Sequence, residues 1–346
     1  MVMNHPGDVM LSEIRETPNM LRNLVKSFDS NVTAQNLFKT HDFQSVIILA
    51  RGTSDNAAHF LKYLIEIKLG LPAGLASPSA ATMYSAKFKY QKTLIVALSQ
   101  SGQSADLIAF ANAAKAGSGY VLSITNAPDS PLAQISDLHI PINAGPERAV
   151  PATKSYVGQL FVSFLLVNAW SENAVNVDQL ISSAENWCES TSKIDDFAAA
   201  FDITKPVYVL GRGYSYPNAK EFALKLQETS LIPVQGMSSS DFLHGPIASL
   251  RSDSQVIFIA PIGTPKDSFG ESPARIREIT GKVFWVGTSD LSKENDIVLQ
   301  GNRAETEVEA SIADAIAFQL ITHKVATLNG LNPDSPRGLN KITITR

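Results

Sequence analysis

The sequence has a single cysteine, Cys188, and no run of apolar residues long enough to cross a membrane. One cysteine excludes a disulfide within the chain and a cysteine-rich zinc site. Cys188 lies in a polar segment with no histidine nearby, so we expect an unreactive structural thiol. The longest apolar run, residues 160–170, is shorter than the roughly 20 residues that a spanning helix needs.

Several signals of charged partners and of export are also missing. Residues 1–21 have neither the basic start nor the apolar centre of a signal peptide. The net charge of −4 does not favour capture of nucleic acid or of an anionic membrane. We therefore expect a cytoplasmic protein whose partners include neither nucleic acid nor a membrane.

Cofactor motifs are scarce as well. The phosphate-binding pattern G-x-x-x-x-G-K-[ST] does not occur, and Gly211-Arg212-Gly213 lacks the third glycine of the dinucleotide fingerprint. No two histidines have the spacing of metal ligands. The sequence predicts no cofactor and no metal.

What the sequence does contain is a duplicated pattern of short apolar segments alternating with amphipathic helices. In the first half these segments are residues 45–50, 93–99, 119–125 and 138–142, and in the second half they are 207–213, 255–261, 282–289 and 295–301. Each half ends in a long helical pattern, about 153–170 and 307–328. Nearly continuous apolar runs indicate strands covered on both faces, hence a parallel sheet between helices.

The fold class predicted from this pattern is α/β, with two tandem domains that each hold a doubly wound parallel sheet flanked by helices. The expected organisation is an N-terminal helical segment, a first domain, a second domain and a C-terminal tail. Their boundaries are 1–34, 35–172, 173–330 and 331–346. The polar stretch 171–195 is expected to be helical and to join the two halves.

Two strand-to-helix turns of the first half are rich in hydroxyl donors. Segment 45–50 leads into Thr53 and Ser54, and segment 93–99 ends in a turn that contains Ser99, Gln100, Ser101 and Ser104. Ligands of open α/β sheets bind beyond the carboxyl ends of strands, where helix N-termini present N–H groups to anions. Helix capping is the alternative for Thr53 and Ser54. The matching turns of the second half are poorer in hydroxyls, so the first half is the candidate anion site.

Residues suited to proton chemistry gather in the second half. Glu221, Lys225 and Glu228 share one face of a predicted helix, and His244 lies in a polar loop closed by Gly245 and Pro246. A solvated face of ordinary ion pairs is the alternative for these charges, and an incidental position is the alternative for the histidine.

The C-terminal tail is unusual for a chain end. Pro333, Pro336 and Gly338 prevent the preceding helix from continuing. Three turn formers ahead of Lys341 predict a tail that folds back along the surface in a defined path rather than a frayed end.

Together these segments resemble the sugar isomerase (SIS) family, in particular the isomerase domain of the glutamine–fructose-6-phosphate amidotransferases. The segments that carry the resemblance are 51–58, 98–107, 143–156, 211–230, 241–250 and 334–344, in the order of that family. The resemblance implies two SIS domains, an enzyme and a phosphosugar substrate. It also implies a homodimer with shared active sites.

The resemblance also implies a role for each site residue. Ser99, Gln100, Ser101 and Ser104 would hold the phosphate together with Thr53 and Ser54, while Val150 and Ala152 would contact the sugar. Glu228 would be the base that moves a proton between C1 and C2, with Lys225 beside it. His244, from the neighbouring subunit, would open the ring, and Lys341 would contact the open-chain sugar, where the amidotransferases form a Schiff base. A carboxylate and an imidazole suit proton transfer near neutral pH, and a lysine amine suits attack on a carbonyl.

Two departures from the amidotransferase pattern bear on the substrate. Ala152 replaces a serine that touches the sugar, and Gln103 replaces a glutamate. The glutaminase half is absent from this sequence, so we expect the deaminase direction, in which glucosamine 6-phosphate gives fructose 6-phosphate and ammonia. Fructosamine-6-phosphate deglycase, galactosamine-6-phosphate deaminase and plain isomerase are alternatives. A sugar-phosphate sensor without catalysis is a further alternative, although residues 1–44 contain no basic recognition helix. In every enzymatic alternative, the hydroxyl turns must converge on one pocket with Glu228, His244 and Lys341.

Overall fold

The chain forms two compact units, which we describe from a computed structural model that covers residues 5–29, 31–302 and 304–341. Among the described residues, the first-sheet unit consists of 19–29, 31–147, 154–176 and 340–341, and the second-sheet unit consists of 5–18, 148–153, 177–302 and 304–339. The chain therefore passes between the units more than once. No helix in the described ranges has the length and apolar character required to cross a membrane.

The first-sheet unit is built on a parallel sheet with the strand order β2-β1-β3-β4-β5. Its strands are β1 (Ser45–Leu49), β2 (Ala73–Leu75), β3 (Thr93–Ser99), β4 (Tyr120–Thr125) and β5 (Leu138–Pro141). Each of the seven residues of β3 is buried, as expected for a central strand that helices cover on both faces. The strand order reverses direction between β1 and β3, and this is where open α/β sheets bind ligands.

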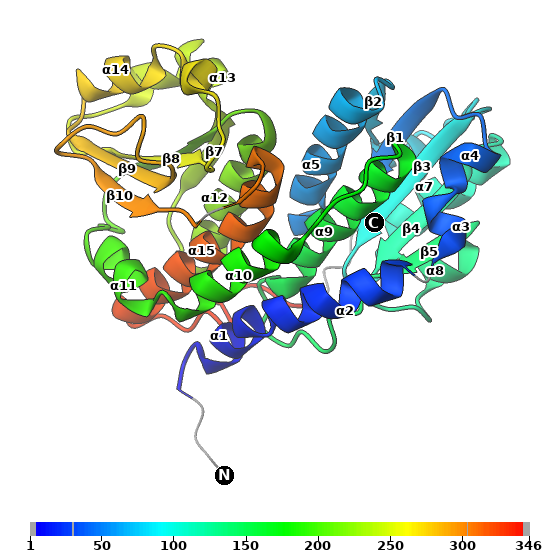
Figure 1. Cartoon of the computed structure of the whole chain (residues 1–346), viewed down its shortest axis with the longest axis horizontal. Helices are drawn as coiled ribbons and strands as arrows, with labels where there is room; N and C mark the ends of the chain where they lie inside the picture. Colours follow the sequence, from blue (N-terminus) through cyan, green and yellow to red (C-terminus); the bar gives the residue numbers. More distant parts are fainter. Residues whose placement is uncertain (1–4, 30, 303, 342–346) are drawn as a thin grey trace. The chain divides into compact units, whose positions relative to one another are not determined.

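Helices cover both faces of this sheet. They are α3 (Val32–Gln35), α4 (Leu37–Thr40), α5 (Thr53–Lys68), α6 (Pro78–Thr82), α7 (Ala105–Ala116), α8 (Pro131–Ile135) and α9 (Lys154–Trp170). Helices α5 and α9 pack side by side on one face, whereas α6, α7 and α8 pack together on the other (Figure 1). Ahead of them in the chain come α1 (Asp8–Arg15) and α2 (Thr17–Asp29).

The second-sheet unit repeats this plan with the strand order β10-β9-β8-β6-β7, all parallel. Its strands are β6 (Val207–Gly211), β7 (Val234–Ser238), β8 (Gln255–Ala260), β9 (Lys282–Gly287) and β10 (Ile297–Gln300). Its helices are α10 (Asp178–Glu189), α11 (Thr191–Ala199), η1 (Gly213–Ser215), α12 (Tyr216–Ser230), α13 (Ser239–Leu243), η2 (Pro246–Ser249), η3 (Lys266–Phe269), α14 (Ser272–Arg277) and α15 (Glu307–Leu328).

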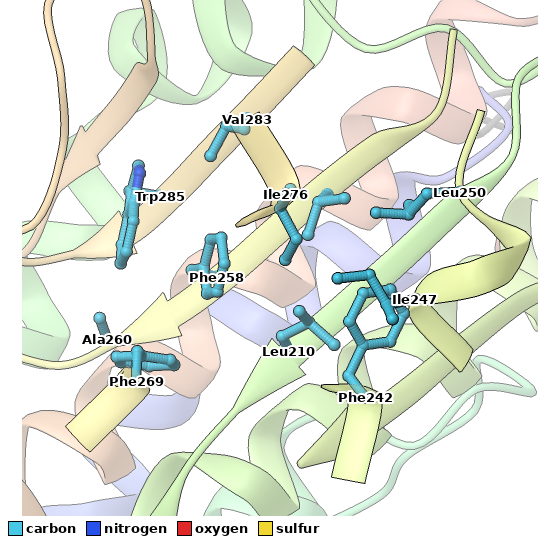
Figure 2. Close-up of a cluster of buried hydrophobic side chains, with 11 residues drawn as sticks. Leu210, Phe242, Ile247, Leu250, Phe258, Ala260, Phe269, Ile276, Val283 and Trp285 are labelled. Atoms are coloured by element: carbon cyan, nitrogen blue, oxygen red, sulfur yellow. The ribbon is translucent and has the colours of Figure 1, made fainter. Parts of the chain in front are cut away.

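A dense aromatic core fills the α13 and α14 side of this second sheet. Figure 2 shows Phe258 and Trp285 from adjacent strands beside Phe269, with Phe242 of α13 farther along the same layer. The rings of Phe258 and Trp285 stack with centroids 4.4 Å apart, and Phe269 meets Phe258 edge to face at 5.3 Å. Such pairs add about 0.5–1.5 kcal/mol beyond the area that they bury. This core fixes α13, the element that leads into His244.

The predicted fold class is confirmed by these two five-stranded parallel sheets between helices. The expected strands begin and end within two residues of their predicted limits, and the two long closing helices are α9 and α15. Helices also cover most of the described part of 1–34, the expected N-terminal helical segment, and of 171–195. The prediction missed β2 and β7, because both are short edge strands whose sequences contain glycine and carry little periodicity.

Candidate functional site

The turn between β3 and α7 collects hydroxyl groups at the carboxyl edge of the first sheet. Ser99 ends the strand, and its Oγ accepts a hydrogen bond from the backbone N–H of Gly102 at 3.0 Å. The Oγ of Ser101 accepts one from the N–H of Gln103 at 3.3 Å. Gly102 has a φ of 63°, and a Cβ at this position would lie 2.1 Å from Ser130 Oγ. Only glycine fits here, so the chain can turn sharply at this edge.

The carbonyl groups of this turn are bound from the side of β4. The backbone N–H of Asn126 donates to the carbonyl of Gln100, and that of Leu132 donates to the carbonyl of Gly102, both at 3.1 Å. These bonds fix the orientation of the peptide groups before any ligand binds. A turn whose peptide groups are held in one orientation is a suitable frame for an anion site.

Capping does not account for the serine that precedes α7. Ser104 occupies the N-cap of this helix, yet its side chain makes no capping hydrogen bond within the described residues. The Ser104 hydroxyl is half-buried at the positive end of a 12-residue helix. An N-cap serine that does not cap is available to a ligand.

The neighbouring turn, between β1 and α5, is tied to this one by an ion pair. Arg51 Nε donates to Asp106 Oδ2 at 2.9 Å, which joins the end of β1 to the first turn of α7. Thr53 is half-buried and is the first residue of α5, with Gly52 at the N-cap. Ser54 is buried, and its Oγ accepts a hydrogen bond from Gln159 of α9 at 2.9 Å. Ser54 therefore joins α5 to α9 as well as lying in the turn.

The matching edge of the second sheet carries an acid instead. Glu307 begins α15 and accepts a hydrogen bond from Thr264 at 3.3 Å, and burial raises the pKa of its carboxyl. Burial, with the nearby Glu307 as the smaller cause, raises the pKa of Tyr214 to about 12. This edge of the second sheet therefore carries a half-buried acid where the first sheet carries serines. That only the first half is built for an anion stays a prediction.

Helix α12 carries a buried row of alternating charge. Lys225 Nζ lies 3.5 Å from Glu221 Oε1 and donates a hydrogen bond to Glu228 Oε2. The side chains of Glu221 and Lys225 are 0% and 1% exposed, whereas that of Glu228 is 20% exposed. The alternative of a solvated helix face is therefore wrong. Buried charges are costly unless they are paired. In this row Lys225 pairs with both Glu221 and Glu228, and of the three side chains only that of Glu228 is partly exposed.

The position of this row depends on close packing between α12 and β7. A Cβ at Gly236 of β7 would lie 2.4 Å from the carbonyl oxygen of Ala219, so only glycine allows the two backbones to approach so closely. Pro217 stands in the first turn of α12, where its missing N–H costs nothing.

His244 follows α13 in the same unit. It is the C-cap residue of this short helix, its backbone N–H donates to the carbonyl of Asp241 at 3.1 Å, and its side chain is exposed. Phe242, two residues earlier, is fully buried in the aromatic core. The turn is thus anchored firmly while the imidazole remains at the surface of the unit.

The C-terminal tail follows a defined path along the part that the structure describes, as predicted. The Asp334 carboxylate accepts backbone N–H bonds from Gly7, Val9 and Met10 at 2.7–3.3 Å, which caps the start of α1. Its carbonyl accepts the N–H of Val150 at 2.9 Å. Val150 and Ala152 are both half-buried. The predicted tail also includes residues 342–346, which lie outside the described residues.

Lys341 belongs to the first-sheet unit and pairs there with Glu147. Its Nζ donates to Glu147 Oε2 at 3.0 Å, and the two side chains are 24% and 0% exposed. The same carboxylate accepts the N–H and the hydroxyl of Ser155 in the first turn of α9. This contact places the lysine at a helix N-terminus of the unit that holds the hydroxyl turns.

The predicted residues are thus divided between the units. The first-sheet unit holds Thr53, Ser54, Ser99, Gln100, Ser101, Ser104 and Lys341, and the second-sheet unit holds Val150, Ala152, Lys225, Glu228 and His244. Convergence of the two groups on one pocket stays a prediction. No role was predicted for Glu147, Asn126, Arg51 or Asp334. The sequence signal available for Glu147 was an acidic residue a few positions before a long apolar helix.

Cys188 is the one cysteine of the sequence and lies in α10. Burial is the main cause that raises the pKa of its thiol to about 11. A thiol with such a pKa forms almost no thiolate at neutral pH, as is typical of an unreactive structural cysteine.

Curated sequences support the resemblance along nearly the whole chain. The glutamine–fructose-6-phosphate aminotransferase (isomerizing) of Aquifex aeolicus is 31% identical over 97% of this chain and 57% of its own length. That of Methanothermobacter thermautotrophicus is 30% identical over 96% of this chain and 56% of its own length. The chain thus spans little more than half the length of these relatives.

Solved structures agree on the fold. The C-terminal domain of glucosamine–fructose-6-phosphate aminotransferase from Francisella tularensis matches with a TM-score of 0.85 at 25% identity, over 95% of this chain and 98% of that chain. A protein from Silicibacter pomeroyi, proposed to be a phosphosugar isomerase, matches with a TM-score of 0.82 at 29% identity, over 94% and 99%. The glucosamine-6-phosphate deaminase of Thermotoga maritima shares the fold, with a TM-score of 0.77 at 21% identity over 97% and 99%.

The SIS domain itself is recognised twice, over residues 41–169 and 204–328. These two ranges contain the two parallel sheets, each with its hydroxyl or acidic turn at the carboxyl edge. The chain is therefore a tandem SIS-domain protein and belongs to the SIS family.

Proposed function

We propose that this chain is a phosphosugar aldose–ketose enzyme that converts glucosamine 6-phosphate to fructose 6-phosphate and ammonia. The observation that carries the proposal is the buried row Glu221, Lys225 and Glu228 on α12. In this row, only the Glu228 carboxylate reaches the surface of its unit. A paired carboxylate with limited exposure is well suited to take a proton from carbon and return it.

The phosphate of the substrate binds at the hydroxyl turns of the first-sheet unit. Ser99, Gln100, Ser101 and Ser104 supply donors from one turn, and Thr53 and Ser54 supply them from the other. The bound carbonyls of Gln100 and Gly102 support this assignment, because they hold the turn in a single conformation. In the proposed complex, Val150 and Ala152 border the sugar.

Proton transfer then proceeds on the open-chain sugar. His244 of a neighbouring subunit assists ring opening, and its exposed imidazole is compatible with such a role. Glu228 takes the proton from C2 while water gives a proton to O1, and the product is an enolamine between C1 and C2. Glu228 returns its proton to C1, and the nitrogen gives up one proton, which restores the water. The C2 imine that results is hydrolysed by water to the ketone and ammonia. Lys225 holds the base, and Lys341 contacts the open-chain sugar.

The direction of the reaction is supported by the chemistry of Cys188. Release of ammonia from glutamine by a cysteine nucleophile needs a reactive thiolate. The one cysteine of these 346 residues has its pKa raised to about 11 by burial. Cys188 is therefore unsuited to this chemistry, and in the proposed reaction the ammonia comes from the amino group of the sugar.

A coupled assay tests the proposal. Purified protein and glucosamine 6-phosphate should give fructose 6-phosphate and ammonia in equal amounts. Production of ketose without ammonia from glucose 6-phosphate would instead indicate a plain isomerase. The panel includes galactosamine 6-phosphate and a phosphorylated fructosamine, because Ala152 and Gln103 depart from the amidotransferase pattern. Tight binding of these sugars without turnover of any of them would contradict the proposal and indicate a sensor.

A further inference from the structure

The carboxylate of Glu147 is buried and accepts hydrogen bonds from three directions. Ser155 N–H donates to Oε1 at 3.0 Å, Ser155 Oγ donates to Oε2 at 2.7 Å, and Lys341 Nζ donates to Oε2 at 3.0 Å. The first two bonds fix the carboxylate at the N-terminus of the 17-residue helix α9, where the helix dipole favours a negative charge. The acid is thus held by the fold, and the lysine is held by the acid.

The loop that carries Glu147 is also attached to the proposed phosphate turn. Asn126 Nδ2 donates to the carbonyl of Gly145, and Asn126 Oδ1 accepts the N–H of Ala144, both at 2.8 Å. The backbone N–H of the same asparagine donates to the carbonyl of Gln100. One side chain and one peptide group therefore connect the turn at the end of β3 with the loop ahead of α9. All of these residues belong to the first-sheet unit.

This ion pair differs from the other lysine pairs of the same unit. The side chains of Lys115 and Asp137 are 35% and 32% exposed, and those of Lys92 and Asp42 are more exposed still. Exposed pairs of that kind hold a lysine only weakly. In the Glu147–Lys341 pair the side chain of the acid is completely buried. Removing one member of a buried ion pair strongly lowers stability, because the other charge is left buried without its partner.

From these contacts we propose that Glu147 is the positioning residue for Lys341. Its buried carboxylate holds the lysine amino group at a fixed place relative to the phosphate turn. Asn126 is hydrogen-bonded both to that turn and to the loop that carries Glu147, and so keeps the two in place. The inference rests on the proposed function, in which Lys341 contacts the open-chain sugar. Glu147 itself touches no substrate, and acts only through the lysine.

The variant Glu147→Gln tests this role. The amide keeps the shape of the side chain and an oxygen for the Ser155 N–H, but its NH₂ group or its neutral oxygen replaces the anion at Lys341. We expect kcat to fall by about 10- to 100-fold, while KM for the sugar phosphate changes little because the phosphate turn is intact. Ser155→Ala is the comparison variant, since it removes one bond to Glu147 Oε2 but keeps the Ser155 N–H bond to Oε1 and the negative charge that faces Lys341, so its loss of kcat should be smaller. Glu147→Asp, which keeps the charge on a shorter side chain, replaces Glu147→Gln if the latter fails to fold.

A double-mutant cycle separates positioning from a structural role. In a Lys341→Met background, Glu147→Gln should cause no further loss of kcat, because the residue through which it acts is gone. Losses that multiply in the double variant would overturn the inference. So would a fall in kcat for Ser155→Ala as large as that for Glu147→Gln.

A second readout does not depend on catalysis. Brief acetylation with acetic anhydride, followed by mass spectrometry, measures how accessible each lysine amine is. Glu147→Gln should raise the labelling rate of Lys341 several-fold and leave that of Lys115 unchanged. Unchanged labelling of Lys341 overturns the inference whether or not the protein is active. If the wild-type protein turns over no phosphosugar, the proposed function is rejected. A several-fold rise of Lys341 labelling in Glu147→Gln would then still support the contact between Glu147 and Lys341.

Discussion

At the scale of single residues, the chain contains a buried acid that has no part in the proposed chemistry. Asp314 of α15 is fully buried, and its Oδ1 accepts a hydrogen bond from the indole N–H of Trp187 at 2.9 Å. Its Oδ2 has no hydrogen-bond partner among the described residues. Burial raises the pKa of this carboxyl to about 7, against which the Trp187 bond acts only weakly.

The raised pKa of Asp314 predicts a pH-dependent stability. At a pH below the unfolded value near 3.8 the carboxyl is neutral in both states and burial costs little. As the pH rises toward about 7, ionisation of the unfolded chain progressively favours unfolding. Asp314→Asn keeps the acceptor for Trp187 and does not ionise. It should therefore match the wild type near pH 4 and exceed it at pH 8, by as much as about 4 kcal/mol.

Urea unfolding at a series of pH values measures this difference. The control is Asp195→Asn. Asp195 lies on α11, is half-exposed and pairs with Lys324 of α15, so its loss should change the free energy of unfolding by less than about 1 kcal/mol. An Asp314→Asn protein that is as unstable at pH 8 as the wild type would contradict the argument.

At the scale of elements, function depends on how tightly turns and helix ends are fixed. Gly102 of the β3–α7 turn combines a φ of 63° with a site where a Cβ would meet Ser130. Gly102→Ala should displace the Ser101 and Ser104 hydroxyls and weaken phosphate binding by about tenfold or more. The expected signature is a higher KM for the phosphosugar and a weaker inhibition by inorganic phosphate.

Gly70 provides a matched control for that substitution. It has a φ of 64° but no atom within 4 Å of a Cβ, and it follows α5 at the opposite end of that helix from Thr53. Gly70→Ala carries the same backbone strain without the steric clash at the turn. Equal losses of phosphate affinity in the two variants would show that strain alone, and not the shape of the turn, is responsible.

Asp334 supports a different element, the first turn of α1. Removing its carboxylate in Asp334→Ala leaves the N–H groups of Gly7, Val9 and Met10 without that acceptor. Loss of a helix cap costs about 0.5–2 kcal/mol. The midpoint of thermal unfolding should fall in Asp334→Ala. Asp290 is exposed, so the control variant Asp290→Ala should have nearly the midpoint of the wild type. Equal midpoints for the two variants would mean that the tail does not cap α1.

At the scale of the whole molecule, the proposed site combines Glu228 with a His244 from a neighbouring subunit. If this is so, Glu228→Gln and His244→Ala proteins are each inactive alone. Unfolded and refolded together in equal amounts, they should recover about a quarter of the wild-type sites, because half of the dimers are hybrids with one intact site. Mixtures that stay inactive, although hybrid dimers have formed, would exclude sharing of these residues between subunits.

The sequence was informative about the layers of this fold because its central strands are nearly continuous apolar runs. It also located the hydroxyl turns and the charged row on α12, since spacing alone defines both. The sequence could not predict burial. The side chains of Glu221 and Lys225 are inaccessible to solvent, and a helical pattern of charges does not reveal this. Contacts between residues distant in the sequence were also missed, because a pattern of residue types does not show which side chains meet in the fold. Glu147 and Lys341, which are 194 positions apart, are an example.

The central claim is that Glu228 moves a proton on a phosphorylated sugar. Exchange with solvent tests it most directly, because proton transfer through a carboxylate incorporates deuterium from D₂O whether ammonia is released or not. NMR of glucosamine 6-phosphate and its product should show deuterium at C1 or C2 with the wild-type protein and essentially none with Glu228→Gln. Wild-type incorporation by the Glu228→Gln protein, or turnover without any incorporation, would contradict the account.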